Sequence, residues 1–241
     1  MITLYTTPPL WGLPSISPAC MKLETWLRMA KLPYTIDTSL NFALAPKGKI
    51  PFINYQDKFV GDSTLIIEML KEKEGIDIDA DLTTTERAIS LAFRRMLKEN
   101  TYWGLVYIRY NVEENWQVYR EVLANMLKAS VPAEQCESIV EELSKNIRTQ
   151  MYSQGIGRHS SDEIYQIIIA DFQALSDLLA DKPFFMGNKP TTLDATAYAI
   201  IATCIKPPFG HPIVDYVIQL ENLCQHYDRM TQQFFSDMKF N

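Results

Sequence analysis

The chain has 241 residues, a formal net charge of −6 and a pI near 5.2. This acidic balance, with no basic block, argues against nucleic acid or an anionic membrane as the main partner. Apolar residues make up 47% of the chain and aromatic residues 11%, so a sizeable core is expected and bulk disorder is excluded. We see no secretory leader and no apolar run long enough to cross a bilayer.

Cysteine usage points to a reducing compartment. The chain has four cysteines, and their spacing matches neither a CxxC pair nor a zinc site. Scattered single thiols in a chain of this length fit the cytosol better than a disulfide scaffold. We therefore expect a cytoplasmic protein without a metal. The cysteines are Cys20, Cys136, Cys204 and Cys224.

Strand and helix signals alternate along the first 75 or so residues. Ser17 followed by Pro18 is typical of a helix start, and apolar residues then recur at helical spacing to Ala30. The order of elements predicts a small sheet with two parallel and two antiparallel strands, which is the thioredoxin-like arrangement. The predicted strands are Ile2–Tyr5, Tyr34–Thr38, Pro51–Gln56 and Lys58–Gly61, and the closing helix is Asp62–Glu74.

Beyond Asp81 the strand signals almost vanish, and the pattern becomes helical. We expect a fold of the α/β plus all-α class, with a thioredoxin-like domain over residues 1–76 and an all-helical domain over 82–241. The predicted junction between the two domains is Leu82–Thr85, a helix-capping segment that leads to Glu86. The predicted helices are Thr85–Tyr110 and about 113–129, 133–150, 161–181, 192–205 and 213–236.

The most informative segment surrounds Pro51, at the head of an apolar strand. Proline cannot donate a ladder hydrogen bond there, but a cis Ile50–Pro51 bond would turn the preceding backbone polar groups toward a ligand. Asp62 and Ser63 open the next helix, where free N–H groups favour a carboxylate. This pair of features suits a short peptide with a carboxylate at each end, such as glutathione. Lys49 either reaches one carboxylate or is a solvated lysine at the strand edge.

Four segments of the chain resemble the glutathione S-transferase superfamily. The strand led by Pro51 and the Asp62-Ser63 pair match its glutathione site. Residues 15–28 and 154–160 are similar to the branch containing failed axon connections proteins and metaxins. Residues 184–195 look like the late signature of the helical domain, in which Thr191–Asp194 has capping-box spacing and a structural role. The resemblance implies a homodimer.

The resemblance implies a catalytic role for Ser17, whose hydroxyl would donate a hydrogen bond to the glutathione thiolate. Such a bond contributes about 1.5–3 kcal/mol, which corresponds to a thiol pKa lowered by about one to two units. The alternative is an ordinary N-cap. Ser63 and its N–H would take the γ-glutamyl carboxylate, Asp62 would help to hold the ammonium group, and Lys49 would reach the glycine carboxylate.

Other residues have two interpretations. Cys20 is either a small buried side chain, which we favour, or a redox thiol. Tyr5 is either strand packing, also favoured, or a catalytic tyrosine. The aromatic side chains that share a helix face belong either to the core or to a second-substrate pocket, and the Arg158 loop is either a surface turn or part of that pocket. The candidates for this pocket are Trp11, Trp103, Tyr107, Tyr110, Arg158 and His159.

We expect a glutathione transferase that conjugates glutathione to an electrophile, whose identity the sequence does not specify. The alternatives are a non-catalytic binding or scaffold module and glutathione-dependent thiol chemistry through Cys20. A metaxin-like import role is not expected, because we see no membrane anchor after Phe235.

Overall fold

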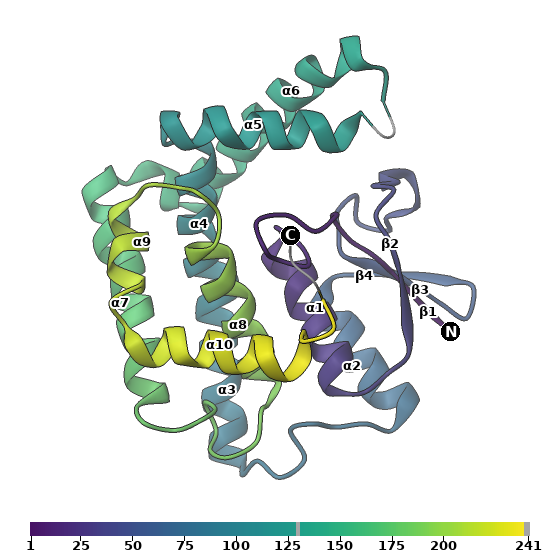
Figure 1. Cartoon of the computed structure of the whole chain (residues 1–241), viewed down its shortest axis with the longest axis vertical. Coiled ribbons are helices and arrows are strands. Elements are labelled where there is room, and N and C mark those ends of the chain that lie inside the picture. The colour runs from purple at the N-terminus through teal and green to yellow at the C-terminus, as the bar shows by residue number, and fades with distance from the viewer. Residues whose placement is uncertain (129–130, 239–241) are drawn as a thin grey trace.

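The computed structural model describes residues 1–128 and 131–238 and contains one four-stranded sheet beside a larger set of helices (Figure 1). Residue 129, at the end of one predicted helix, and residues 239–241 of the predicted second domain lie outside the described residues. The strands of the sheet and the helices between and after them are β1 (Ile2–Tyr5), α1 (Pro18–Met29), β2 (Tyr34–Asp37), a 3₁₀ turn η1 (Phe42–Leu44), β3 (Phe52–Tyr55), β4 (Lys58–Gly61) and α2 (Ser63–Glu74).

The sheet has the order β2-β1-β3-β4, with β1 parallel to β2 and antiparallel to β3. Tyr5 lies opposite Phe52, and Phe52 lies opposite Gly61, so the ends of three strands meet beside the start of α2. Tyr5 stacks on Phe52 with ring centroids 4.3 Å apart, as the packing interpretation expected. The predicted thioredoxin-like sheet is confirmed.

The remaining described elements are helical. The sequence predicted one helix over 213–236, which is wrong: residues 218–220 form a turn between two helices, and His211 with Pro212 starts the first of them. The helical elements are α3 (Thr84–Met96), a π turn η2 (Leu97–Thr101), α4 (Tyr102–Tyr110), α5 (Glu113–Leu127), α6 (Ala133–Gln154), a 3₁₀ turn η3 (Ile156–Arg158), α7 (Ser161–Leu179), α8 (Thr192–Ile205), α9 (Pro212–Val217) and α10 (Glu221–Phe234).

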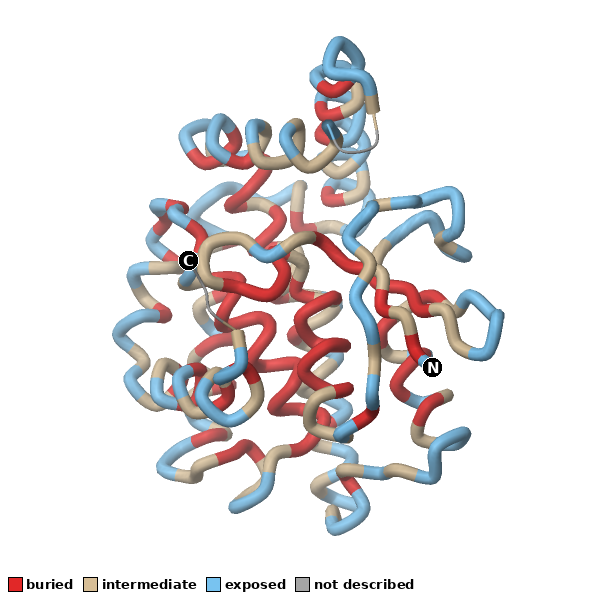
Figure 2. Tube along the Cα trace, turned by 45° about the vertical axis from the view of Figure 1, so that its right-hand side comes forward, coloured by how far each residue is buried: buried red, intermediate tan, exposed pale blue. Residues whose placement is uncertain are grey.

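Helix α8 forms the centre of the molecule. All of its residues from Thr192 to Cys204 are buried, and α8 packs against α1, α3 and α10. Ala195 joins the apolar cluster under the sheet, whereas Leu193 and Ala197 belong to the larger cluster among the helices. Figure 2 shows that buried residues are concentrated in these central helices, while the α5–α6 pair at the top is more exposed.

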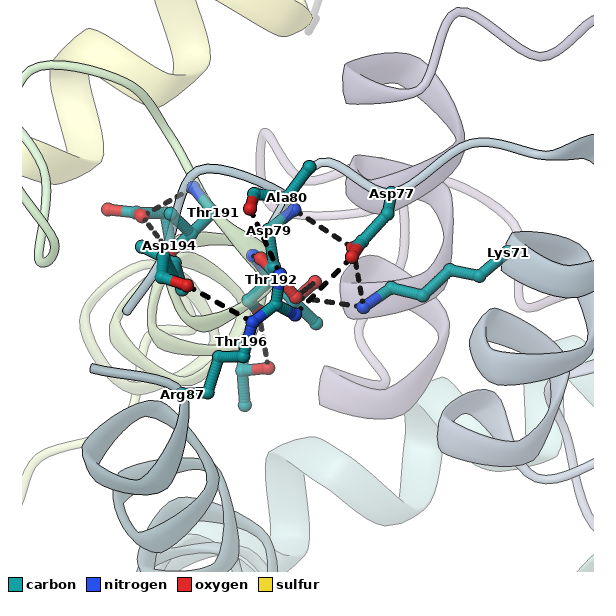
Figure 3. A network of polar contacts seen from close by, with 10 residues as sticks. Lys71, Asp77, Asp79, Ala80, Arg87, Thr191, Thr192, Asp194 and Thr196 are labelled. Carbon is teal, nitrogen blue, oxygen red and sulfur yellow. Dashed lines mark hydrogen bonds and ion pairs between the residues drawn. The ribbon is translucent and has the colours of Figure 1, made fainter. Parts of the chain in front are cut away.

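The segment between α2 and α3, where the domain boundary is predicted, is fastened to the start of α8. Asp79 is 4% exposed, and its carboxylate accepts hydrogen bonds from the Thr192 N–H at 2.8 Å and from the Thr192 hydroxyl at 2.6 Å. Lys71 Nζ also lies 2.9 Å from this carboxylate. Beside it, Asp194 accepts from the Thr191 N–H, which confirms the predicted return of Asp194 to the cap backbone (Figure 3).

Replacing Asp79 with alanine should lower the free energy of unfolding, because both Thr192 donors lose a charged acceptor. We expect a loss of about 1.5–3 kcal/mol, the range for hydrogen bonds to charged groups, measured by urea denaturation. The exposed Asp81, which pairs with Lys189, provides the control: Asp81→Ala should leave the urea midpoint nearly unchanged. Equal midpoints for Asp79→Ala and wild type would contradict this role for Asp79.

Candidate functional site

A cavity of about 310 Å³ lies where the strand ends and the starts of α1 and α2 meet η2, α4 and α8. The structure brings together here all six residues predicted for catalysis and glutathione binding, which come from three separate segments. The lining residues are Ser17, Pro18, Ala19, Lys22, Lys47, Lys49, Ile50, Pro51, Asp62, Ser63, Lys98, Glu99, Tyr102, Trp103, Thr196 and Ile200.

The Ile50–Pro51 peptide bond is cis, which is the condition that the ligand-binding interpretation of Pro51 required. Pro51 is buried and immediately precedes β3, and Ile50 lies at the edge of the cavity. Strand pairing of β3 begins only at Phe52, so the backbone before it is not used by the sheet. This leaves backbone polar groups of the Ile50 segment at the cavity wall, where an extended peptide could bond to them.

Ser17 is the N-cap of α1, and its hydroxyl accepts a hydrogen bond from the Cys20 N–H at 3.4 Å. A serine hydroxyl has one hydrogen to donate in addition to its accepting lone pairs. Because the accepted bond does not use that hydrogen, capping and donation to a ligand are compatible. The cap interpretation and the functional interpretation of Ser17 therefore do not exclude each other.

The loop that carries Ser17 is held by buried polar side chains. The Thr7 and Ser15 hydroxyls are 2.6 Å apart, and they accept from the N–H groups of Ile16 and Ser17, both at 3.2 Å. From α4, the buried Arg109 donates to the Ile16 carbonyl at 3.0 Å. These bonds hold the backbone next to Ser17, so the hydroxyl has a fixed place in the cavity wall.

Cys20 is fully buried behind Ser17. Burial raises the pKa of its thiol above the ordinary value, although hydrogen bonds from Ser17 and its neighbours oppose this. A thiol with a raised pKa is a poor nucleophile, because the thiolate is the reactive form. The packing interpretation of Cys20 is thus favoured over redox chemistry.

Asp62 has a φ of 77° and caps α2. Its carboxylate accepts from the N–H groups of Thr64 at 2.8 Å and Leu65 at 3.2 Å, and it lies 3.1 Å from Lys98 Nζ. Partial burial alone would raise the pKa of Asp62, but the bonds from Leu65, Lys98 and Thr64 hold it below its usual range. Asp62 is therefore already engaged, whereas Ser63 is 4% exposed and lines the cavity.

Most of the basic side chains of this cavity were not predicted from the sequence. Lys22, Lys47 and Lys98 line it together with the predicted Lys49, and Asp62 and Glu99 supply the acidic side chains of its lining. Lys49 also donates to Gln150 on α6 at 3.0 Å. A signal for Lys22 was present in the sequence, since it lies one helical turn after Pro18 on a helix whose neighbouring positions are apolar.

Of the six candidates for a second-substrate pocket, Trp103 lines this cavity, next to Tyr102, with ring centroids 5.3 Å apart. Tyr107 and Tyr110 lie about 6 and 10 Å farther along the helix axis, given 1.5 Å per residue. Tyr110 is 7% exposed and stacks on Trp116, while Tyr107 contacts His211. The shared helix face predicted from their spacing therefore does not bring them into the cavity.

Trp11, Arg158 and His159 are also absent from the cavity lining. Trp11 packs on Phe209 with ring centroids 5.3 Å apart. Arg158 and His159 are exposed at the turn between α6 and α7. Gly157 explains this turn, because a Cβ atom at that position would lie 2.8 Å from the Tyr152 backbone nitrogen.

Family models of the glutathione S-transferase N-terminal and C-terminal domains match residues 18–115 and 168–230. The chain is 32% identical to an isoprene-epoxide–glutathione S-transferase of Rhodococcus sp. (strain AD45), over 97% of this chain and 99% of that protein. The chain belongs to the glutathione S-transferase family. It is also 34% identical to Failed axon connections of Drosophila melanogaster, over 93% of this chain and 56% of that protein. Metaxin-1 of Mus musculus is 27% identical, over 93% of this chain and 72% of that protein.

Solved structures agree on the fold. A glutathione S-transferase from Methylobacterium radiotolerans in complex with glutathione sulfonate superimposes with a TM-score of 0.61, over 98% of this chain and 93% of that chain. Glutathione transferase F7 from Populus trichocarpa gives a TM-score of 0.60, over the whole of both chains. Their identities of 14% and 13% mean that these likenesses concern the fold alone. The predicted fold class and family resemblance are confirmed.

Within residues 1–128 and 131–238, no three His, Cys, Asp or Glu side chains are grouped as metal ligands. The helices formed by the same residues include none with both the length and the apolar character needed to cross a bilayer.

Replacing Asp62 with alanine should lower the free energy of unfolding at neutral pH by about 0.5–2 kcal/mol, the usual cost of a lost N-cap. The folded-state pKa of Asp62 lies below its unfolded value, so its contribution is complete above about pH 4 and disappears as the pH falls through the folded pKa. Urea denaturation at several pH values measures this difference. The exposed Glu72 on the same helix is the control, since Glu72→Ala removes no cap and should leave the urea midpoint at neutral pH nearly unchanged.

Proposed function

We propose that this protein binds reduced glutathione in the cavity and presents its thiolate near Ser17 to an electrophile. The observation that carries the proposal is the meeting of Ser17, the cis Pro51 segment and Ser63 on one cavity. These three features belong to different segments of the chain, and each binds a different part of glutathione in this proposal. The proposed domains, residues 1–76 and 82–241, would supply the glutathione site and most of the electrophile site.

The charge and size of the cavity suit this ligand. Glutathione carries two carboxylates and one ammonium group, and the cavity has cations from several segments of the chain. Lys22 and Lys98 lie beside the start of α2, and Lys47 and Lys49 lie in the loop before Pro51. A volume of about 310 Å³ is at the lower end of the range for small-molecule sites.

Within this proposal, Asp62 acts on the ligand indirectly. It caps the start of α2 by accepting from the Thr64 and Leu65 N–H groups and pairs with Lys98, so the γ-glutamyl carboxylate is received by the hydroxyl and the N–H of Ser63. Lys49, which is exposed, reaches the glycine carboxylate. Its bond to Gln150 must open or be shared when the ligand binds.

The proposed chemical step is nucleophilic attack by the glutathione sulfur. Ser17 donates a hydrogen bond to the thiolate, and this favours loss of the thiol proton to solvent. With an epoxide as the electrophile, a carbon–sulfur bond forms, the carbon–oxygen bond of the ring breaks, and the alkoxide takes a proton from water. We name epoxides as the first class to test because the relative from Rhodococcus carries an epoxide in its name. Tyr102 and Trp103 provide an apolar wall for such a molecule.

A second candidate function is glutathione binding without conjugation. It is favoured by the 34% identity to Failed axon connections, whose name states no enzymatic activity. The two functions share the same ligand but differ in turnover. Thiol chemistry through Cys20 receives less support, because the thiol is fully buried.

Reduced glutathione should raise the melting temperature. At about 100 times the dissociation constant, binding stabilises the folded state by about 2.7 kcal/mol, which corresponds to about 5–11 °C for a chain of this size. Differential scanning fluorimetry measures the shift. Arg158 lies outside the cavity, so the melting temperature of the Arg158→Ala variant should rise by the same amount with glutathione. No shift at millimolar glutathione would overturn both candidate functions.

Ser17→Ala should lower turnover with an epoxide about ten- to a hundredfold, as expected for one to two units of thiol pKa. The affinity for glutathione should change little, because Pro51 and Ser63 remain. The rising limb of the pH–rate profile should move to higher pH. Cys20→Ala is the matched control and should leave conjugation nearly intact; the reverse pattern would assign the chemistry to Cys20.

We also propose a homodimer, as the family resemblance implies. Leu65 on α2 and Leu91 on α3 are 53% and 48% exposed, and burying them in an interface would be favourable. A light-scattering mass near 27.7 kDa at micromolar concentration would overturn the dimer without affecting the fold.

A further inference from the structure

Lys22 is an unusual feature of the cavity wall, because it is a buried lysine without an acidic partner. It is 8% exposed, it lines the cavity, and its Nζ donates to the Thr64 hydroxyl at 2.9 Å. Across the described part of the chain, no ion pair includes Lys22. A buried ammonium without a counter-charge is unfavourable, and hydrogen bonding to one hydroxyl offsets only part of that cost.

The groups around Lys22 make its charged form still less favourable. A small crevice next to the cavity brings three cationic side chains close to Lys22: Lys98 of η2 and Arg94 and Arg95 of α3. Thr64 and Leu91 complete the lining of this crevice. Asp62, the acidic group that faces Lys22, is engaged with Lys98 and the α2 backbone.

Other elements around the cavity add no neutralising partner for Lys22. Helix α8 contributes the uncharged Thr196 and Ile200, and the loop before β3 contributes Lys47 and Lys49. Glu99 also lines the cavity, and it lies 3.7 Å from Lys98. Burial, followed by Lys98, lowers the pKa of Lys22 to about 7, and Asp62 opposes this only in part.

We infer that Lys22 receives a ligand carboxylate beside Ser63 and takes up a proton when that carboxylate binds. Thr64, which holds Lys22, directly follows Ser63 at the start of α2, so one carboxylate can contact both residues. This inference rests on the proposed function, and it identifies the γ-glutamyl carboxylate as the partner. The carboxylate stays ionised, the neutral amine gains one proton from the buffer, and the site acquires a balanced ion pair.

The sign of the pH dependence follows from this proton balance. Below about pH 7 the free protein already carries the proton on Lys22, so binding takes up none. Above that pH the free amine is largely neutral, and the bound carboxylate restores its charge. The affinity should therefore fall as the pH rises above 7, by up to about tenfold per pH unit, until the pKa of Lys22 in the complex is reached.

Isothermal titration calorimetry with S-methylglutathione tests the inference. This probe keeps both carboxylates but has no thiol proton to release, so it isolates the contribution of Lys22. At pH 8, titrations in HEPES and Tris should give heats that differ by the uptake of nearly one proton. The affinity of the wild-type protein should fall about fivefold between pH 7 and pH 8.

Three variants provide the controls. Lys22→Met should bind more weakly at pH 6.5 and take up no proton at any pH. Lys22→Arg keeps its charge throughout, so it should restore binding without proton uptake or a loss of affinity above pH 7. Lys49→Met, in the loop before Pro51, should lower the affinity and keep the proton uptake.

The outcomes separate the two proposals. Binding to the wild type without proton uptake, or uptake that persists in Lys22→Met, would overturn the role of Lys22 and leave the proposed function standing. Absence of binding to the wild type at any pH would overturn the proposed function, and the inference with it. Circular dichroism and urea denaturation confirm that each variant is folded.

Discussion

The carboxylate of Asp79 and the first residue of α8 form the contact on which the arrangement of the two halves depends. Asp79 accepts both the N–H and the hydroxyl of Thr192, in a place from which water is excluded. Helix α8 then packs along α1, which carries Ser17 at its start and Lys22 in its second turn. Asp79, which does not line the cavity, thus fixes the start of the helix that packs along α1.

Polar groups around the cavity fall into two kinds. Arg109 is buried, but its guanidinium donates to the carbonyls of Ile16 and Thr203 and lies over the Tyr119 ring, so its polar atoms have partners. Lys22 is buried with one hydroxyl partner and cationic neighbours. Incompletely satisfied charges are costly in a folded protein, and they are characteristic of sites that complete themselves with a ligand.

Local sequence patterns predicted most of the fold. The Ser17-Pro18 start, the strand beginning after Pro51 and the Asp194 return bond depend on neighbours within a few residues, and the structure contains all three. The break at residues 218–220 was missed because no proline or glycine marks it. The π turn at Leu97–Thr101 was missed as well, since one turn of altered pairing barely changes the periodicity of apolar residues.

The candidate site also combines residues that local sequence patterns predict with residues that only long-range packing brings in. The sequence was enough to predict the candidate residues that depend on their own local backbone, namely Ser17 at a helix start, Pro51 at the head of a strand and Ser63 at the next helix start. The packing of distant segments selects the side chains that join them: Lys22 and Lys98 line the same cavity as Ser63, whereas Tyr110 lies in the core. Helical spacing specifies the face of a helix, but contacts between distant segments specify what that face meets.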